Sequence, residues 1–309
     1  MTTLAGPSLW QNTVLKFAPL LMPRGGLMQQ HRLRTPFRKR VPAQPLAQLG
    51  PLQIRLAETG ADVRRSQRLR YRVFFEEMSA VAKPWSKVTR RDADLYDAHC
   101  DHLLVEDEAQ RAGRFRREVV GSYRLLRGSA AAQIGSFYSE SEFDLGALSQ
   151  HFHMPNALEL GRSCVLPAYR NKRTIELLWR GIWEYIVAHR CDVLIGCASF
   201  DGTDPERIAL PLSFLHHYAA APAEWQIRAR PDRAVEMNRV PKDAVDMKAA
   251  MRALPPLIKG YLRVGACVGS GAVIDHAFGT IDVLMVLPVS AIGKRYVEYF
   301  GSNGELKAA

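Results

Sequence analysis

The stretch "ELGRSCVLPAYRNKRTIELLWRGIW", residues 159–183, joins a predicted strand to a predicted helix through a basic loop. Apolar and polar side chains alternate over 158–165, and apolar side chains recur at helical spacing over 174–189. The first turn of a helix has unpaired N–H groups and carries the positive end of the helix dipole. This junction therefore predicts a site for an anionic group, with a solvated basic turn as the alternative. Three cations lie in the loop: Arg170, Lys172 and Arg173.

The chain around this junction alternates predicted strands with predicted helices, which indicates an α/β domain over residues 51–309. We expect 101–107 and 118–127 to form an antiparallel hairpin, and Asp62 and Thr174 to lie near the starts of two helices. The other strands are expected at 52–58, 158–165, 191–200, 225–229 and 280–288. The helices are expected at 61–78, 174–189, 204–218 and 244–253, with a short one near 140–150.

The positive charge of the chain is concentrated at its N-terminus. The net charge is +11, and residues 1–50 contain seven Lys and Arg but no Asp or Glu. We expect a poorly ordered basic arm over 1–50, which is either a plain disordered tail or an arm attracted to an anionic membrane surface or to nucleic acid. Trp10, Phe17 and Phe37 favour the membrane, and the nearly balanced charge of the remaining residues makes nucleic acid the weaker alternative.

The apolar and cysteine patterns indicate where the protein works. The longest apolar stretches are far shorter than the roughly 20 residues that span a bilayer, and we expect no cleavable signal peptide. The five cysteines form no close pair, as is usual in a reducing compartment. We expect a cytoplasmic protein, with peripheral association at the inner membrane as a further possibility. No histidine or cysteine group has the spacing of a metal site, so no metal is expected.

The stretch "VLPAYRNKRTI" (165–175) resembles the donor-binding motif of the GCN5-related N-acetyltransferase (GNAT) superfamily. This resemblance implies a mixed, largely antiparallel central sheet flanked by helices. It also implies that the loop binds coenzyme A or the phosphopantetheine of an acyl carrier protein. Lys172, Arg173 and Thr174 stand where the superfamily usually has glycines, which points to an altered thioester donor. Acyl carrier proteins are acidic, so they suit this loop, and the enzyme would need no cofactor of its own. The implied donor-binding residues are Val165, Arg170, Lys172, Arg173 and Thr174.

A second, dispersed set of residues resembles the acyl-homoserine-lactone synthases, in the same order along the chain. This resemblance implies that the acyl donor is a carrier protein and that the set surrounds the substrates. Taken singly, each residue has a plain structural interpretation, such as a surface charge or a core aromatic. The set comprises Arg70, Phe74, Trp85, Asp94, Asp97, Arg124, Glu159 and Arg162.

Residues 50–303 resemble the bacterial L-ornithine N-alpha-acyltransferase family, most specifically over 159–186 and 254–290. The second stretch belongs to a family-specific extension over about 225–309. The resemblance implies transfer of a 3-hydroxyacyl chain from acyl carrier protein to the α-amine of L-ornithine, giving lyso-ornithine lipid. Alternatives within the class are lactone synthesis or acylation of another amino acid. A basic nucleic-acid-binding protein or a lipid-surface protein is the alternative from another class.

The chemistry implied by this resemblance needs a base and an oxyanion site. Glu159 is the expected base beside Arg162, unless the two form a salt bridge that would lower the pKa of Glu159. Backbone N–H groups near Cys164–Leu166 would hold the thioester oxygen, and the Cys164 thiol is expected to be inert. Two groups of side chains would bind the acceptor: Asp94 and Asp97 its ammonium groups, and Arg124 and Arg162 its carboxylate.

Overall fold

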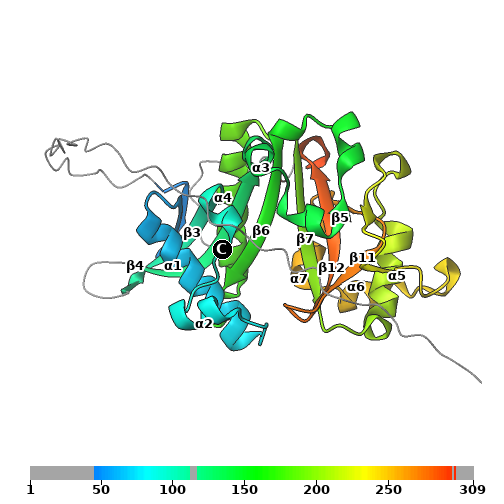
Figure 1. Ribbon diagram of the computed structural model, residues 1–309, viewed down its shortest axis with the longest axis horizontal. Helices are drawn as coiled ribbons and strands as arrows, with labels where there is room; N and C mark the ends of the chain where they lie inside the picture. Colours follow the sequence, from blue (N-terminus) through cyan, green and yellow to red (C-terminus); the bar gives the residue numbers. More distant parts are fainter. Residues whose placement is uncertain (1–44, 112–116, 294–295, 297–309) are drawn as a thin grey trace, which may run out of the picture. The chain divides into compact units, whose positions relative to one another are not determined.

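The structure is a computed structural model that describes residues 45–111, 117–293 and 296 (Figure 1). These described residues belong to one compact unit. Most of the expected basic arm, residues 1–44, lies outside them. The sheet begins with β1 (Ala47–Leu49), so the folded part includes residues just before the expected boundary at 51. No helix in the described ranges is long and apolar enough to cross a bilayer.

The described strands form one large mixed sheet in the order β1-β2-β3-β4-β6-β7-β12-β11-β9, with β10 also paired to β12. Neighbouring strands are antiparallel except β6 and β7, which are parallel. The predicted α/β class with a largely antiparallel sheet is therefore confirmed. The central strands are β2 (Leu52–Leu56), β3 (Asp101–Arg111), β4 (Arg117–Arg127), β6 (Ala157–Val165), β7 (Val193–Asp201) and β12 (Thr280–Pro288). The shorter strands are β9 (Ala234–Val235), β10 (Cys267–Val268), β11 (Ala272–Asp275) and the separate pair β5 (Phe143–Asp144) and β8 (Arg228–Ala229).

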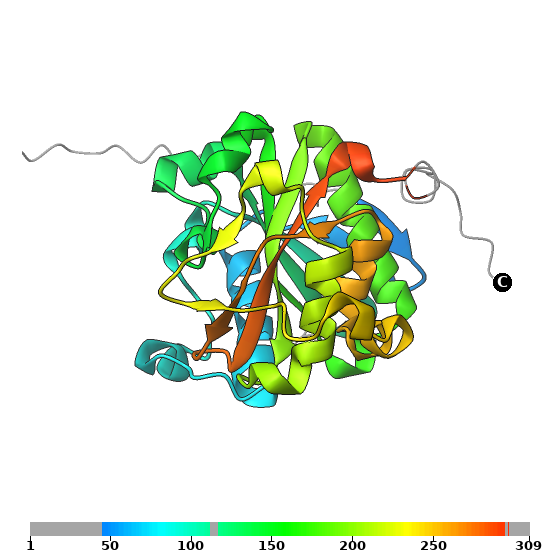
Figure 2. The same cartoon turned by 90° about the vertical axis from the view of Figure 1, so that its right-hand side faces the viewer.

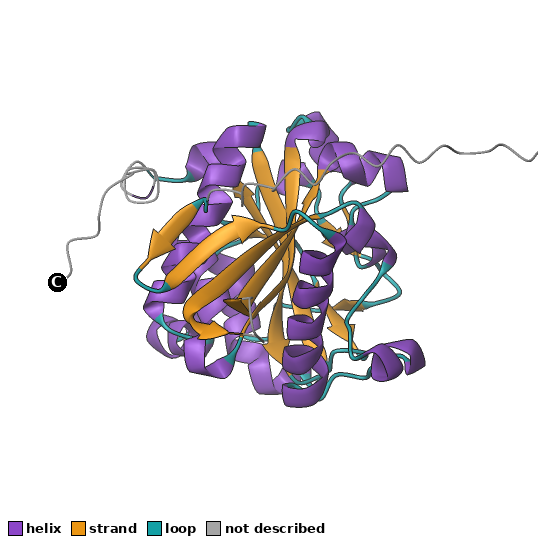
Figure 3. Cartoon of the chain, turned by 90° about the vertical axis from the view of Figure 1, so that its left-hand side faces the viewer, coloured by secondary structure: helices purple, strands orange, loops and turns teal. Residues whose placement is uncertain are grey.

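Helices cover both faces of the sheet (Figure 3). Successive residues of a strand point to opposite faces. On one face, the Ser122 hydroxyl of β4 hydrogen-bonds the Ser66 hydroxyl of α1 (Gly60–Tyr71) at 2.8 Å. On the other face, the Tyr123 hydroxyl of β4 hydrogen-bonds the Tyr261 hydroxyl of α7 (Pro256–Arg263) at 2.7 Å. Figure 2 shows α5, α6 and α7 grouped beside β12. The remaining helices are α2 (Pro84–Thr89), α3 (Gly128–Ile134), α4 (Lys172–His189), α5 (Ala209–Tyr218) and α6 (Met247–Ala253).

Most predicted elements are present, but several ends differ. The predicted helix 61–78 is α1 followed by a π-helical turn (Arg72–Glu77), and its cap is Thr59 rather than Asp62. Helix α4 begins two residues earlier than expected because the Asn171 side chain accepts the Thr174 N–H at 3.2 Å. The short helix expected near 140–150 is replaced by two 3-10 turns (Tyr138–Ser141 and Gly146–Gln150) on either side of β5.

The parallel strands β6 and β7 separate along their length. Their pairing covers Ala157–Glu159 of β6 and Val193–Ile195 of β7, although each strand has nine residues. At the point of separation a Cβ on Gly196 would lie 2.3 Å from the Leu160 carbonyl oxygen, so only glycine fits. On its other side β6 is irregular opposite β4, and Arg162 has a φ of 52°, as expected at a β-bulge. The separation opens the sheet for a ligand.

Candidate active site

A cavity of about 550 Å³ lies where β6 and β7 separate. Its lining includes Val165 and Arg170, next to the start of α4, and Thr280 and Asp282 of β12 on the β7 side of the gap. Apolar side chains from several elements form much of its wall, and they would suit an acyl chain. They include Val73, Phe74, Met78, Leu178, Trp179 and Phe278.

Glu159 is a buried carboxylate on the wall of this cavity, with only 4% of its surface exposed. Its two oxygens accept the backbone N–H groups of Tyr138 and Ser139 at 2.8 and 2.7 Å. Burial raises the pKa of Glu159, and these hydrogen bonds oppose the rise without cancelling it. Such a carboxyl is suited to accept a proton.

Arg162 also lines the cavity, but it does not pair with Glu159. Its guanidinium lies 3.3 Å from Asp92 and donates to the Tyr138 hydroxyl at 3.1 Å. It is also within 4.7 Å of the Tyr138 ring centroid and 4.8 Å of the Phe278 ring centroid. The salt-bridge alternative for Glu159 is therefore not what the structure shows, and its pKa is raised rather than lowered.

Five more charged residues join Arg162 in a buried network beside the cavity. Arg70 is fully buried and makes a bidentate pair with Asp97 at 2.9 and 2.7 Å. Its Nε also donates to Asp92 at 2.8 Å, and Arg124 donates to both oxygens of Asp94 at 2.7 and 2.6 Å. The network thus matches three arginines with three aspartates. Asp94 and Asp97, which the sequence predicted to bind the substrate ammonium groups, already accept hydrogen bonds from these arginines. They therefore have few free oxygen lone pairs for a substrate.

The network explains where the dispersed sequence set lies. Arg124, Glu159, Arg162 and Phe74 line the cavity, whereas Arg70, Asp94 and Asp97 stand behind its wall. Trp85 on α2 is separate from them: it is 67% exposed and does not line the cavity. The structure therefore brings together most of this set, without Trp85.

The predicted donor loop lies at one end of the cavity. Val165 and Arg170 line it, and the Arg170 guanidinium donates to the Val165 carbonyl at 3.0 Å and to Glu77 at 2.8 Å. Lys172 and Arg173 are exposed. Thr174 is buried and its N–H is capped by Asn171, so Thr174 does not face the cavity.

The backbone of β6 supplies a possible oxyanion donor. The Leu166 N–H donates to the Val120 carbonyl of β4 at 2.9 Å. Because alternate N–H groups of a strand point to opposite sides, the Val165 N–H points away from β4, toward the gap between β6 and β7. Of the three positions expected from the sequence, Val165 thus fits best. Burial raises the pKa of the neighbouring Cys164 thiol to about 12, which agrees with its expected inertness.

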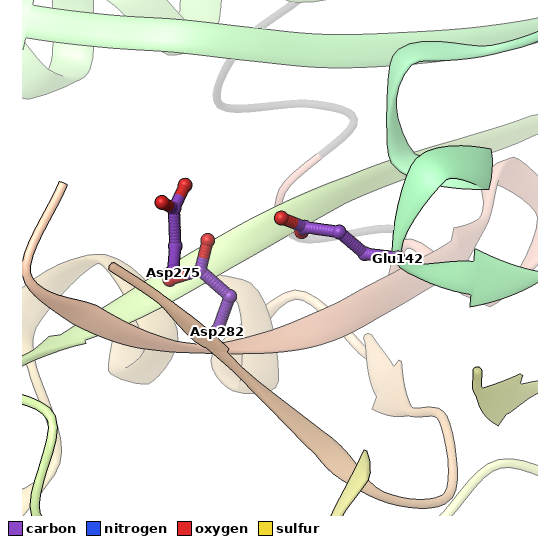
Figure 4. A group of neighbouring side chains, drawn as sticks. All are labelled: Glu142, Asp275 and Asp282. Atoms are coloured by element: carbon purple, nitrogen blue, oxygen red, sulfur yellow. The ribbon is translucent and has the colours of Figure 1, made fainter. Parts of the chain in front are cut away.

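A group of three carboxylates lies beside the cavity. The sequence offered Asp275, with His276, as a residue that would line the acyl or ornithine pocket, but it did not indicate the group. Glu142, Asp275 and Asp282 each place an oxygen within 4.8 Å of the others, and their side chains converge in Figure 4. Asp275 and Asp282 line the cavity. Oxygen groups of this kind can hold a cation. The three residues share no motif, and Glu142 is 133 positions from Asp275 along the chain.

Comparisons with known proteins agree with this fold. A family model described as an acetyltransferase (GNAT) domain matches residues 69–180. A protein of Agrobacterium fabrum, named L-ornithine N(alpha)-acyltransferase, is 51% identical over 83% of this chain and 87% of its own. A protein of the same name from Rhodobacter capsulatus is 41% identical over 80% of this chain and 94% of its own. The crystal structure of the acyl-homoserine-lactone synthase LasI covers 83% of this chain and 98% of its own, with 12% identity and a TM-score of 0.42.

The matched domain and the open sheet define an acyltransferase with a GNAT fold. The similarity to the two relatives identifies the family more specifically than the domain does, because it covers four fifths or more of this chain. The chain belongs to the L-ornithine N(alpha)-acyltransferase family.

Proposed function

We propose that the protein transfers an acyl chain, of the 3-hydroxyacyl type, from acyl carrier protein to the α-amine of L-ornithine. The product would be lyso-ornithine lipid. The observation that carries this proposal is the 41–51% identity to proteins named for ornithine acylation. The cavity supports it, because its lining includes residues of a basic loop as well as an acidic group.

The donor would enter along the loop before α4. The first turn of α4 presents N–H groups and the positive end of the helix dipole to the phosphate of the phosphopantetheine. Lys172 and Arg173 are exposed there and would pair with acidic side chains of the carrier protein. The pantetheine arm would lie between β6 and β7, as a strand-like insertion in the open sheet. The acyl chain would contact the apolar wall around Phe74 and Trp179.

The acceptor amine is mostly protonated near neutral pH, so it must lose a proton before it attacks. Glu159 would take that proton, directly or through a water molecule. The amine nitrogen then forms a bond to the thioester carbonyl carbon, and the oxyanion is held by the Val165 N–H. The attacking nitrogen gives its second proton to water. Collapse breaks the carbon–sulfur bond, and the first proton passes from Glu159 to the departing thiolate. Arg162 would bind the acceptor carboxylate from the cavity wall.

The basic arm would place the enzyme near its lipid product. Residues 1–44 lie outside the described residues, so this part of the proposal rests on their charge alone. Each Lys or Arg near an anionic surface contributes about 1 kcal/mol. Cosedimentation with phosphatidylglycerol vesicles should decrease strongly when residues 1–44 are deleted, and unchanged cosedimentation would contradict this role.

A transfer assay tests the proposed function. Purified enzyme would be mixed with 3-hydroxyacyl carrier protein and labelled L-ornithine, and the lipid extract would be separated by chromatography. We expect label in the lipid fraction with the wild-type enzyme and a kcat about 10²–10⁴-fold lower for Glu159→Gln. No labelled lipid, with the charged carrier protein intact and the enzyme folded, would contradict the function. Equal rates for both enzymes would keep the function and exclude Glu159 as the base.

A further inference from the structure

The carboxylates of Glu142, Asp275 and Asp282, here called the acid cluster, differ from ordinary surface acids in their burial. Glu142 is 4% exposed and Asp282 is 7% exposed. Asp282 of β12 pairs with Val273 of β11 in the strand register, and Asp275 pairs with Thr280, so both aspartates lie on one face of the sheet. Negative charges are thus held together inside the protein.

Positive charge near the acid cluster is scarce. Arg233 approaches Glu142, at 3.5 Å, and its side chain is 34% exposed. Arg162 acts on Asp282 only as a more distant charge. Burial, followed by the charge of Asp282, raises the pKa of Glu142 to about 7, and burial also raises the pKa of Asp282. The acid cluster therefore has more carboxylates than nearby positive charges.

Two buried polar atoms beside the acid cluster make only weak hydrogen bonds. Thr280 is 3% exposed and lines the cavity, and its side chain interacts with the Asp282 carboxylate, as does that of Ser199. Neither the Thr280 hydroxyl nor Asp282 Oδ1 has a hydrogen bond of good geometry among the described residues. Buried polar atoms normally have well-formed hydrogen bonds, so these two have capacity for a ligand that donates hydrogen bonds.

The acid cluster is close to the expected reaction centre. The Cys197 thiol donates to Glu142 at 3.5 Å. Burial raises its pKa, and so do the charges of Glu142, Asp282 and Glu159. Cys197 therefore contacts the acid cluster, whereas Glu159 acts on it as a more distant charge. Glu159, Cys197 and Asp282 line the same cavity, so a ligand there would lie beside both groups.

We propose that the acid cluster and Thr280 bind the side-chain ammonium of the acceptor amino acid, while its α-amine faces Glu159. This subsite rests on the proposed function and would make the enzyme selective for a basic amino acid. An ammonium group has three donors, which suits two carboxylates and a hydroxyl. A divalent metal would need about six oxygen ligands, and Asp275 already accepts the N–H groups of Ala277 and Phe278.

The test compares two acceptors of the same carbon length: L-ornithine and L-norvaline, which lacks the terminal amine. The proposal predicts that Asp282→Asn lowers kcat/KM for L-ornithine about 10- to 100-fold and changes kcat/KM for L-norvaline less than about 2-fold. Asp232→Asn is the matched control, because it removes an exposed carboxylate next to Arg233 and should leave both values unchanged. An equal loss for both acceptors with Asp282→Asn would overturn the proposal.

Two further readouts separate this proposal from its alternatives. Loss of wild-type activity on treatment with EDTA, restored by Mg²⁺ or Mn²⁺, would overturn it in favour of a metal site. Thermal shift with L-ornithine needs no turnover, and the proposal predicts a larger rise in Tm for wild type than for Asp282→Asn. If that difference is present but no acyl group is transferred, the proposed function fails and the ammonium subsite stands. If transfer occurs without the difference, the function stands and the subsite fails.

Discussion

Two groups of buried charges lie beside the same cavity, and they differ in how their charges are matched. The network around Arg70 contains three arginines and three aspartates. Hydrogen bonds of 2.6–2.9 Å join Arg70 and Arg124 to the aspartates, and Arg162 lies 3.3 Å from Asp92. The acid cluster contains three carboxylates with one arginine at 3.5 Å, and one Asp282 oxygen that has no well-formed hydrogen bond in the described part of the chain. Buried charges that are paired with opposite charges stabilise the fold. Buried carboxylates without such pairs, beside a cavity, are expected to bind a cationic ligand.

The largest effect should follow from breaking the matched network. Arg70→Met removes a fully buried guanidinium and leaves Asp92 and Asp97 without their main partner. We expect the free energy of unfolding to fall by about 3–5 kcal/mol in urea denaturation. Arg72→Met is the control, because the Arg72 side chain is 53% exposed, and its loss should be below about 0.5 kcal/mol. Similar losses in the free energy of unfolding for both variants would show that the buried network stabilises the fold no more than a surface ion pair does.

The same contrast applies to two backbone N–H groups of β6. The Leu166 N–H is matched by the Val120 carbonyl, and the Val165 N–H points toward the gap between β6 and β7. Val165→Pro should therefore lower kcat about 10²–10³-fold with little change in Tm. Leu166→Pro should lower Tm instead. If the Val165→Pro enzyme kept the wild-type kcat, the Val165 N–H would not be the group that holds the oxyanion.

A moderate effect is expected from pH. Because the pKa of Glu142 is raised to about 7 in the folded protein, the stability contributed by its protonation is complete below about pH 4.5 and is lost as pH rises through about 7. Asp282→Asn removes a negative charge next to Glu142, so the loss of stability between about pH 4.5 and pH 7 should be smaller in this variant. The Tm difference between Asp282→Asn and wild type should grow from pH 5 to pH 8. A constant difference would show that the cluster charges do not repel.

The smallest effect on stability is expected from exposed, unmatched charges. Lys172→Ala combined with Arg173→Ala removes two exposed side chains, so stability should change by less than about 0.5 kcal/mol. The KM for acyl carrier protein should rise several-fold at low salt, and the difference should shrink at high salt. An unchanged KM at low salt would exclude this loop as the docking surface.

The sequence predicted the strands with strong apolar patterns. Residues 280–288 match β12 because a continuous apolar run ends at a proline, and the hairpin of β3 and β4 follows from alternation on both sides of a turn. Helix α7 was missed because Pro255, Pro256 and Gly260 interrupt its helical pattern. The start of α4 was misplaced because Asn171 and Thr174 can both cap a helix, and only the side-chain geometry decides between them.

The site was predicted in part, for a related reason. Sequence order singled out Arg124, Glu159 and Arg162, which the structure places on the cavity wall, and their roles stay predictions. It could not show that Asp94 and Asp97 face arginines. Matching of charges is a property of three-dimensional distance. Asp275 was singled out from the sequence, but its grouping with Glu142 and Asp282 was missed. Glu142 follows a 3-10 turn, and the two aspartates lie on two strands that meet only in the folded sheet.

The central claim is that the acid cluster serves a ligand and weakens the empty protein. The most direct test is thermal unfolding of Asp282→Asn without substrate. We predict that the Tm of Asp282→Asn is about 2 °C or more above that of wild type at pH 8. Asparagine has nearly the shape of aspartate but no charge, so the substitution relieves repulsion among the carboxylates. A Tm below that of wild type would show that Asp282 stabilises the fold, and would contradict the account.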